Sequence, residues 1–166
     1  MSSTLTENIN LFQPTGFQVT IDRKNYGNLQ FFVQSISHPG ASNSAVETPY
    51  KRIQGVPMPG NTMEFGELTL EVLLDEDMNS YIEMYNWLLR LVNTKQIAER
   101  DNQGTIPTYA DIVINALTSH NNNNRKFTYI DCVPTSVGAI SFEATNQSVE
   151  YITFPASFRF SYFVIE

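Results

Sequence analysis

The sequence predicts a mainly β protein, an antiparallel β-sandwich or barrel with one flanking α-helix. Short segments in which apolar and polar residues alternate recur along much of the chain, and this period of two is typical of strands with one buried face. Clusters of Gly, Pro, Asn and Asp separate these segments, as turns do between antiparallel strands. One stretch, residues 78–92, has apolar residues at helical steps of three and four. About seven or eight strands with a single helix favour a sandwich or barrel.

The segment from Glu64 to Val92 contains both patterns. Its first part predicts a strand with one apolar face, formed by Leu68, Leu70, Val72 and Leu74. Asp75 follows as a favourable helix N-cap. The residues expected to pack the helix against the sheet are Met78, Tyr81, Ile82, Tyr85, Leu88, Leu89 and Val92.

Further strands are predicted on both sides of this segment. Residues 17–22 and 29–36 alternate and are expected to pair as a hairpin across a turn at 25–28. Residues 110–117 and 126–133 are expected to form a second hairpin, because the asparagine run 121–124 between them tolerates turn geometry. The remaining predicted strands are 139–145 and 153–165.

The chain of 166 residues suits a single domain, 1–166, with two segments that lack a core pattern. Residues 1–13 are polar and are expected to form an N-terminal arm, with the apolar Leu11 and Phe12 at its root. Residues 37–62 are rich in Gly and Pro and are long for a connection in a compact domain. Such long connections are usually either functional or disordered.

Three explanations of residues 37–62 compete: disorder, a lid over a site, and an assembly contact. The apolar residues in the segment weigh against full disorder, and a lid requires a site. We therefore expect an assembly loop that contacts a neighbouring subunit through Tyr50, Lys51, Arg52 and Ile53. The two cations are expected to meet carboxylates there, because the chain as a whole carries a net charge of -7. Leu11 and Phe12 are expected at an inter-subunit contact as well.

Composition and charge exclude several classes of protein. A net charge of -7 argues against binding nucleic acid by phosphate neutralisation, which requires clustered Lys and Arg. Cys132 is the only cysteine, so the chain cannot form an internal disulfide. No run of about 18 apolar residues is present, so we expect no membrane span. The N-terminus lacks the basic and apolar regions of a signal peptide, which predicts synthesis in the cytosol.

No motif in the sequence indicates catalysis, and we expect no catalytic residue, metal site or cofactor. His38 and His120 lie in or beside loops without further ligands at metal-binding spacing, so surface roles are favoured. Cys132 lies within a predicted strand, where a small buried apolar residue is the ordinary interpretation. The acidic cluster 75–77 is explained by the positive end of the helix dipole. Phosphate loops, dinucleotide fingerprints and nucleophile elbows are absent from the sequence.

Three segments carry a resemblance to a known family. They are FQVTIDRKNYGNLQFFVQSISHPG at 17–40, PYKRIQGVPMPGNTMEFGELTLEVLLDED at 49–77, and DCVPTSVGAISFEAT at 131–145. In order and character they resemble the tail tube proteins of contractile-tailed bacteriophages, in which a basic loop leads into a strand with an acidic end, followed by the single helix. Pro134, Thr135 and Gly138 match the closing segment of that family.

The resemblance implies a structural virion protein. Its copies would form hexameric rings whose strands join into a continuous inner barrel, and the rings would stack into a tube through which DNA is ejected. The implied partners are further copies of the chain and the tail sheath, tape measure and baseplate or initiator proteins, in the virion tail and, during assembly, in the host cytoplasm. Glu67, Thr69 and Glu71, on the polar face of the central strand, are expected to line the lumen and repel phosphate.

Two other classes compete with the tube. A tail-tube initiator or baseplate subunit, or the tube subunit of a phage-derived injection device, would share the fold. A carbohydrate- or receptor-binding β-sandwich would place aromatic residues in loops, whereas most aromatics here lie on predicted strands or on the helix. An enzyme is the weakest hypothesis, because no motif supports one.

Overall fold

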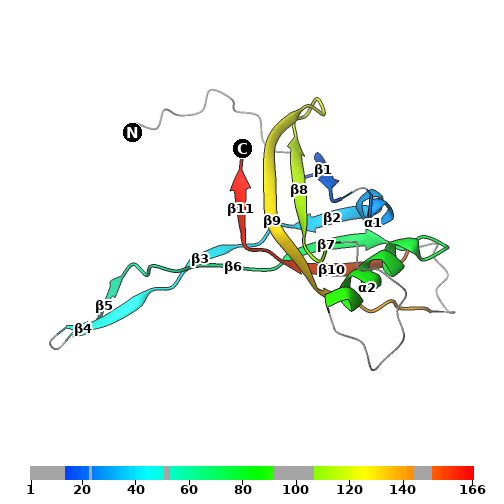
Figure 1. Cartoon of the computed structure of the whole chain (residues 1–166). Coiled ribbons are helices and arrows are strands. Elements are labelled where there is room, and N and C mark those ends of the chain that lie inside the picture. The colour runs from blue at the N-terminus through cyan, green and yellow to red at the C-terminus, as the bar shows by residue number, and fades with distance from the viewer. Residues whose placement is uncertain (1–13, 23, 51–52, 92–106, 144–150) are drawn as a thin grey trace.

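A computed structural model of the chain shows a β-rich body from which a long hairpin arm projects (Figure 1). The structure describes residues 14–22, 24–50, 53–91, 107–143 and 151–166. The strands of the body are β1 (Phe17–Thr20), β2 (Val33–Ser37), β7 (Leu68–Leu73), β8 (Ala110–Leu117), β9 (Asn123–Val137), β10 (Thr153–Arg159) and β11 (Tyr162–Ile165). The helices are α1 (Gly27–Phe31) and α2 (Asn79–Leu91), and the arm contains β3 (Ala41–Asn43), β4 (Val46–Tyr50), β5 (Ile53–Met58) and β6 (Met63–Phe65).

The body is one antiparallel sheet that folds over on itself at β9. Six of its seven strands follow the order β1-β8-β9-β10-β7-β2, and the seventh, β11, pairs with β9. The first half of β9 pairs with β8 and β11, and its second half pairs with β10. Asp131, between the two halves, has a positive φ of 55°, as expected where a long strand bends. The predicted fold class, an antiparallel sandwich or barrel with a flanking helix, is confirmed.

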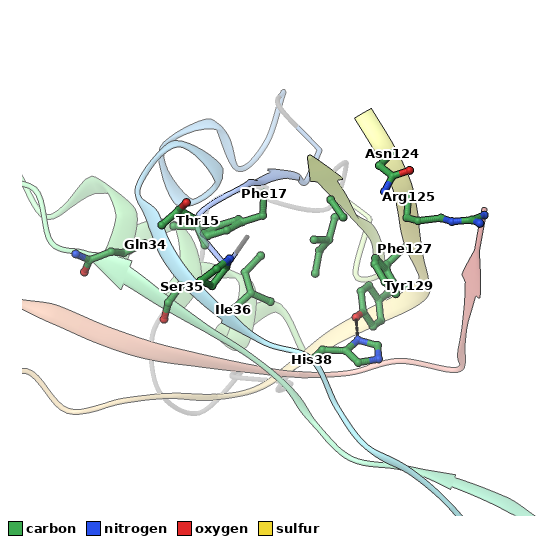
Figure 2. Close-up of a pocket in the computed structure, with 14 residues that line it drawn as sticks. Thr15, Phe17, Gln34, Ser35, Ile36, His38, Asn124, Arg125, Phe127 and Tyr129 are labelled. Carbon is green, nitrogen blue, oxygen red and sulfur yellow. Dashed lines mark hydrogen bonds between the residues drawn. The ribbon is translucent and has the colours of Figure 1, made fainter. Parts of the chain in front are cut away.

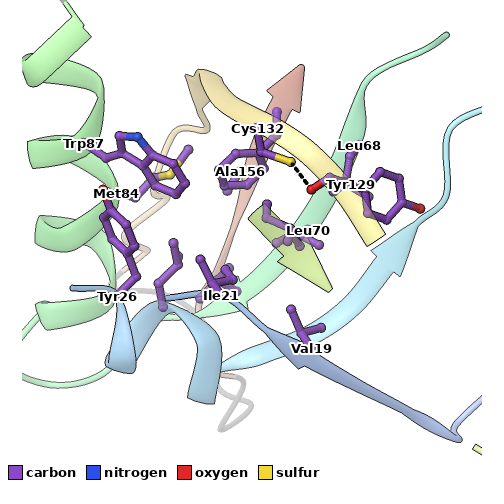
Figure 3. Close-up of a cluster of buried hydrophobic side chains, with 14 of the residues drawn as sticks. Val19, Ile21, Tyr26, Leu68, Leu70, Met84, Trp87, Tyr129, Cys132 and Ala156 are labelled. Carbon is purple, nitrogen blue, oxygen red and sulfur yellow. Dashed lines mark hydrogen bonds between the residues drawn. The ribbon is translucent and has the colours of Figure 1, made fainter. Parts of the chain in front are cut away.

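The core lies between the two parts of the folded sheet and beneath α2 (Figure 3). β7 supplies Leu68, Leu70 and Val72, all completely buried, as their alternation predicts. Trp87 of α2 stacks on Tyr26, with ring centroids 4.2 Å apart. The Trp87 indole N–H donates to the Thr108 carbonyl at 2.8 Å, which satisfies its polar atom inside the core.

The predicted hairpin of 17–22 with 29–36 is wrong. β1 pairs with β8 and β2 pairs with β7, and residues 27–31 form α1 rather than a strand. The carboxylate of Glu83 on α2 accepts hydrogen bonds from the side chain of Asn28 and, at 2.8 Å, from the backbone N–H of Leu29. The bond from Leu29 satisfies a backbone donor that the first turn of a helix leaves free, and its acceptor is 54 residues away in sequence.

The predicted start and face of the main helix require correction. α2 begins at Asn79, and the Asp75 carboxylate accepts hydrogen bonds from the backbone N–H groups of Asn79 and Ser80, each at 3.0 Å. The buried residues of α2 are Ser80, Met84 and Trp87. Ile82 and Tyr85, which we expected against the sheet, are 47% and 48% exposed, and Leu88 and Leu89 are half-buried.

Among the C-terminal predictions, the strand 110–117 coincides with β8, and its hairpin with β9 is confirmed. Residues 139–143 form no strand, and the rest of the predicted strand 139–145 lies outside the described residues. The predicted strand 153–165 is divided into β10 and β11, because the chain bends at Ser161, whose N–H donates to the Ile130 carbonyl at 3.0 Å. Among the described residues, no helix has the length and apolar character needed to cross a membrane.

Candidate assembly surfaces

Residues 37–62 form most of a two-stage hairpin arm rather than an irregular loop. Next to the body, β3 pairs with β6 from Ala41↔Phe65 to Asn43↔Met63. Further out, β4 pairs with β5. These strands project away from the body (Figure 1), so they have no core against which to bury one face. The periodicity by which strands are recognised in sequence is therefore missing here.

The joint between the two stages depends on a glycine. The Ser44 N–H donates to the Thr62 carbonyl at 3.1 Å, which continues the pairing past β3 and β6. A Cβ atom on Gly60 would lie 1.5 Å from the Ser44 carbonyl oxygen. Glycine is required at position 60 because the opposing backbone occupies the place of a side chain.

Aromatic side chains anchor the root of the arm to the body. Phe65 of β6 lies 5.6 Å from Phe160 and 5.4 Å from Phe163, measured between ring centroids. On the other side of the root, His38 Nδ1 lies 2.5 Å from the Tyr129 hydroxyl. Burial lowers the pKa of His38, which favours the neutral imidazole in this contact. His38 is exposed, as the sequence suggested, and its contact with Tyr129 also helps to position the root of the arm.

Two of the four predicted contact residues of the arm, Tyr50 and Ile53, are described by the structure. Tyr50 and Ile53 are paired across the end of the β4–β5 hairpin, at the far end of the arm from the body (Figure 1). Lys51 and Arg52 between them lie outside the described residues, as do Leu11 and Phe12. The end of a projecting arm is well placed to meet another molecule, because its own core is distant.

Two of the predicted lumen residues, Thr69 and Glu71, share one face of β7, and Glu67 immediately precedes the strand. Glu67 is exposed, Thr69 and Glu71 are half-buried, and the residues between them face the core. Three serines extend this face onto the neighbouring strands. Ser37 and Ser157 flank Thr69, and Ser35 and Pro155 flank Glu71. The structure thus assembles a polar face of a four-stranded region, β9-β10-β7-β2, whose opposite face packs in the core.

One residue of this polar face was missed by sequence reasoning. The Arg159 guanidinium Nε of β10 lies 3.1 Å from the Glu67 carboxylate Oε1. The two residues are 92 positions apart, and only the pairing of β10 with β7 brings them together. Arg159 therefore offsets part of the negative charge that Glu67 and Glu71 supply.

The ends of the sheet order are also candidate contact surfaces. β1 and β2 occupy the two ends of the strand path, so each has one edge without a strand partner among the described residues. Unpaired backbone N–H and C=O groups on such an edge favour pairing with a strand of another chain. These two edges were not predicted as contacts, because their position depends on the topology.

Cys132 and His120 are residue types that can act as nucleophiles or metal ligands, so their surroundings were compared with those of such sites. Cys132 is fully buried and its thiol donates to the Tyr129 carbonyl at 3.6 Å. Burial raises the pKa of Cys132 to about 12, so the reactive thiolate is scarce at neutral pH. His120 is exposed beside the turn between β8 and β9. Within the described ranges, no three His, Cys, Asp or Glu residues gather as metal ligands.

Comparison with known proteins identifies the family. The family model described as phage tail tube protein matches residues 5–166. The chain belongs to the phage tail tube protein family. Among curated proteins, the chain is similar to the tail tube terminator protein of Enterobacteria phage T4, with 30% identity over 118 residues. That match covers 69% of the chain and 66% of the T4 protein, so the chain spans just under two thirds of its relative's length.

Solved structures from contractile injection systems share the fold of this chain. One match is a chain from the sheath–tube complex of PVC, an extracellular contractile injection system, in the extended state. Its TM-score is 0.69 and its sequence identity is 17%, and the match covers 99% of both chains. The tube-terminating cap of the anti-feeding prophage matches with a TM-score of 0.66 and 19% identity, covering 99% of this chain and 95% of the other. The PVC sheath/tube terminator matches with a TM-score of 0.64 and 17% identity, over 96% and 99%.

Proposed function

We propose that the chain is a subunit of stacked hexameric rings that form the tube of a contractile phage tail. The observation that carries the proposal is the four-stranded region with one apolar face in the core and one polar face. Placed side by side, such sheets from neighbouring subunits would close into a barrel with the polar faces inside. Closure would also use the unpaired edge of β2, which a separate subunit leaves unprotected.

In this arrangement Glu67, Thr69 and Glu71 face the lumen. Carboxylates there would repel phosphate and keep DNA from adhering during ejection. Because Arg159 is paired with Glu67 at 3.1 Å, Glu71 carries the larger share of the unpaired negative charge on this face. Contact with DNA is therefore transient and non-specific.

The arm supplies the contact between rings. Its tip, Tyr50 to Ile53, would reach a subunit of the next ring, where Lys51 and Arg52 meet carboxylates of the acidic partner. Each exposed ion pair contributes only about 0–1 kcal/mol. Repetition around the ring adds these small terms together, and the apolar residues at the tip contribute burial. The sheath, the tape measure protein and the baseplate or initiator proteins would be the remaining partners, in the virion tail after assembly in the host cytoplasm.

A second candidate function is that of a tube terminator, a ring that caps the tube. The relative in phage T4 is named a tail tube terminator, and two of the similar structures come from a cap and a terminator. A terminator would use the same lateral contacts between subunits but would bind the tube through one axial face only. The tube subunit of a related injection device differs from the main proposal only in its cargo.

Electron microscopy of the purified protein distinguishes these functions. A tube subunit should form hollow tubes many rings long, whereas a terminator should form single rings that bind the ends of preformed tubes. Rings without hexameric symmetry would contradict the hexamer, and a protein that stays monomeric at high concentration would contradict both functions.

A further inference from the structure

An apolar groove opens at one end of the body, between the β1–β8–β9 part of the sheet and β2 (Figure 2). Its volume is about 900 Å³. The apolar lining comes from both sides, with Phe17, Ile114, Phe127 and Tyr129 on one and Val33 and Ile36 on the other. A cavity of this size and character is typical of a binding site rather than of a packing defect.

The groove is an uncovered continuation of the core. Deeper in the body, Val19 of β1 is paired with Ile114 of β8, and both are buried. One pair further along the same face, Phe17 is opposite Ala116, and both line the groove. The inner face of the sheet therefore extends beyond the layer that covers it. Apolar surface left open in this way favours an occupant.

The chain itself enters the body at this groove. Pro14 and Thr15 are among the lining residues and form a turn immediately before β1. Gly16 is fixed behind this turn, because its carbonyl accepts a hydrogen bond from the Leu117 N–H at 2.8 Å. Segment 1–13 therefore joins the body at the edge of the groove, through the lining residue Pro14. Three extended residues span about 10 Å, which brings Leu11 and Phe12 within reach.

We propose that the groove is the docking site of the chain's own N-terminal segment, with Leu11 and Phe12 as its apolar anchors. Segment 1–13 contains a single charged side chain, Glu7. Among the described residues that line the groove, Arg125 is the one arginine or lysine. The tip of the assembly arm fits less well, because Lys51 and Arg52 have the same sign as Arg125. The short tether also gives the segment a high effective concentration at its own groove.

This inference does not rest on the proposed tube function, because it concerns a contact within one subunit. It differs from the expectation that Leu11 and Phe12 contact a neighbouring subunit. That expectation would hold if the segment of a second copy occupied the same groove, as in domain swapping. The experiment must therefore distinguish docking within one chain from docking between chains.

Disulfide trapping in the full chain makes this distinction. We expect Phe12→Cys combined with Ile36→Cys to form an intrachain disulfide under mild oxidation, seen as a faster monomer band on a non-reducing gel. The matched control combines Phe12→Cys with Ile82→Cys, since Ile82 is 47% exposed on α2, and should remain uncrosslinked. The native Cys132 will not interfere, because it is fully buried. Covalent dimers or larger species from the Ile36 pair, or no crosslink at all, would overturn the proposal.

A second measurement covers the case in which the Ile36→Cys substitution unfolds the body. The double variant Leu11→Ala/Phe12→Ala leaves every described residue unchanged and should uncover the groove. We expect a several-fold increase in the fluorescence of a dye that binds apolar surface, with an unchanged far-UV spectrum. The control variant Thr4→Ala/Thr6→Ala should show no increase. Equal dye fluorescence in the two double variants would overturn the proposal.

Discussion

The body and the arm are built by different means. In the body, β7 and α2 bury one face each, and the strand alternation and helical spacing of their sequences reflect this burial. The arm has an equally regular backbone, with paired strands in both of its stages, yet its sequence has no comparable period. Hydrophobic patterns therefore report where a chain meets its own core. Backbone pairing that projects from the body leaves no such pattern.

The largest difference between the two regions should appear when a buried side chain of the body is removed. Trp87→Ala deletes a fully buried ring that stacks on Tyr26, and we expect a loss of about 3–5 kcal/mol in the free energy of unfolding. Urea denaturation followed by circular dichroism measures this loss. The control is Tyr85→Ala, because Tyr85 of α2 is 48% exposed. It should change stability by less than about 0.5 kcal/mol. Similar losses in both variants would mean that the face of α2 is wrongly assigned.

A glycine in the arm should give the reverse result, with assembly lost and the body intact. Gly60→Ala places a Cβ atom against the Ser44 carbonyl, so the joint between the two stages must distort. We expect an unchanged unfolding midpoint for the body and a severe loss of sedimentable assemblies. Gly40→Ala is the matched control, because its added Cβ has open space around it. If Gly60→Ala assembles as Gly40→Ala does, the geometry of the arm is unimportant for assembly.

The cap of α2 provides a moderate, pH-dependent effect confined to the body. Burial of Asp75 opposes its ionisation, but hydrogen bonds from Ser80 and Asn79 outweigh this and lower its pKa. The stabilisation is therefore present above the unfolded-state pKa of about 3.9 and is lost as the pH falls through the folded-state pKa. Asp75→Ala should cost about 0.5–2 kcal/mol at pH 7.

Urea denaturation of this variant and the parent protein at several pH values measures the change. Their difference should shrink progressively below about pH 4. Glu76→Ala, an exposed residue outside the helix, should show a smaller effect at every pH. A difference for Asp75→Ala that stays constant down to low pH would rule out the cap as the cause.

The smallest stability effect is expected on the polar face of the sheet. Replacing Glu67 and Glu71 with lysine removes a single exposed ion pair, so stability should change by about 1 kcal/mol or less. If this face lines the lumen, assembled tubes of the double variant should retain DNA at low salt and release it as salt rises. Filter binding measures this retention. The control variant replaces the exposed Glu76 and Asp77 with lysine, which changes the net charge equally. Equal DNA retention by the two double variants would exclude a lumen role for Glu67 and Glu71.

Much of the body could be predicted from the sequence, because its elements follow from nearby residues. The alternation in β7 and β8 required only local period, and the turn between β8 and β9 required only the tolerance of asparagine for such geometry. Helix α1 could not be predicted, since Glu83 of α2 completes its first turn from a distant position. The buried face of α2 was misjudged because it includes Ser80, whose hydroxyl donates to the Leu73 carbonyl at 3.1 Å.

The candidate surfaces divide in the same way, into features that one segment determines and features that depend on distant residues. The polar face of β7 was predicted because Glu67, Thr69 and Glu71 lie at alternate positions in one short segment, of which Thr69 and Glu71 belong to the strand. Arg159 was not, because the register of β10 against β7 brings it to Glu67. The groove was also beyond sequence reasoning, since Phe17 and Ile36 belong to strands that were wrongly expected to pair with each other.

Shortening the arm tests most directly whether body and arm have separate roles. Residues 44–62 would be replaced by an Asn-Gly turn that joins β3 to β6, which preserves the pairing next to the body. We predict a folded, soluble subunit whose unfolding midpoint matches that of the parent protein and which forms no stacked assemblies by negative-stain electron microscopy. Tubes of normal length from this variant would contradict the assembly role of the arm. Loss of the folded body would contradict its independence.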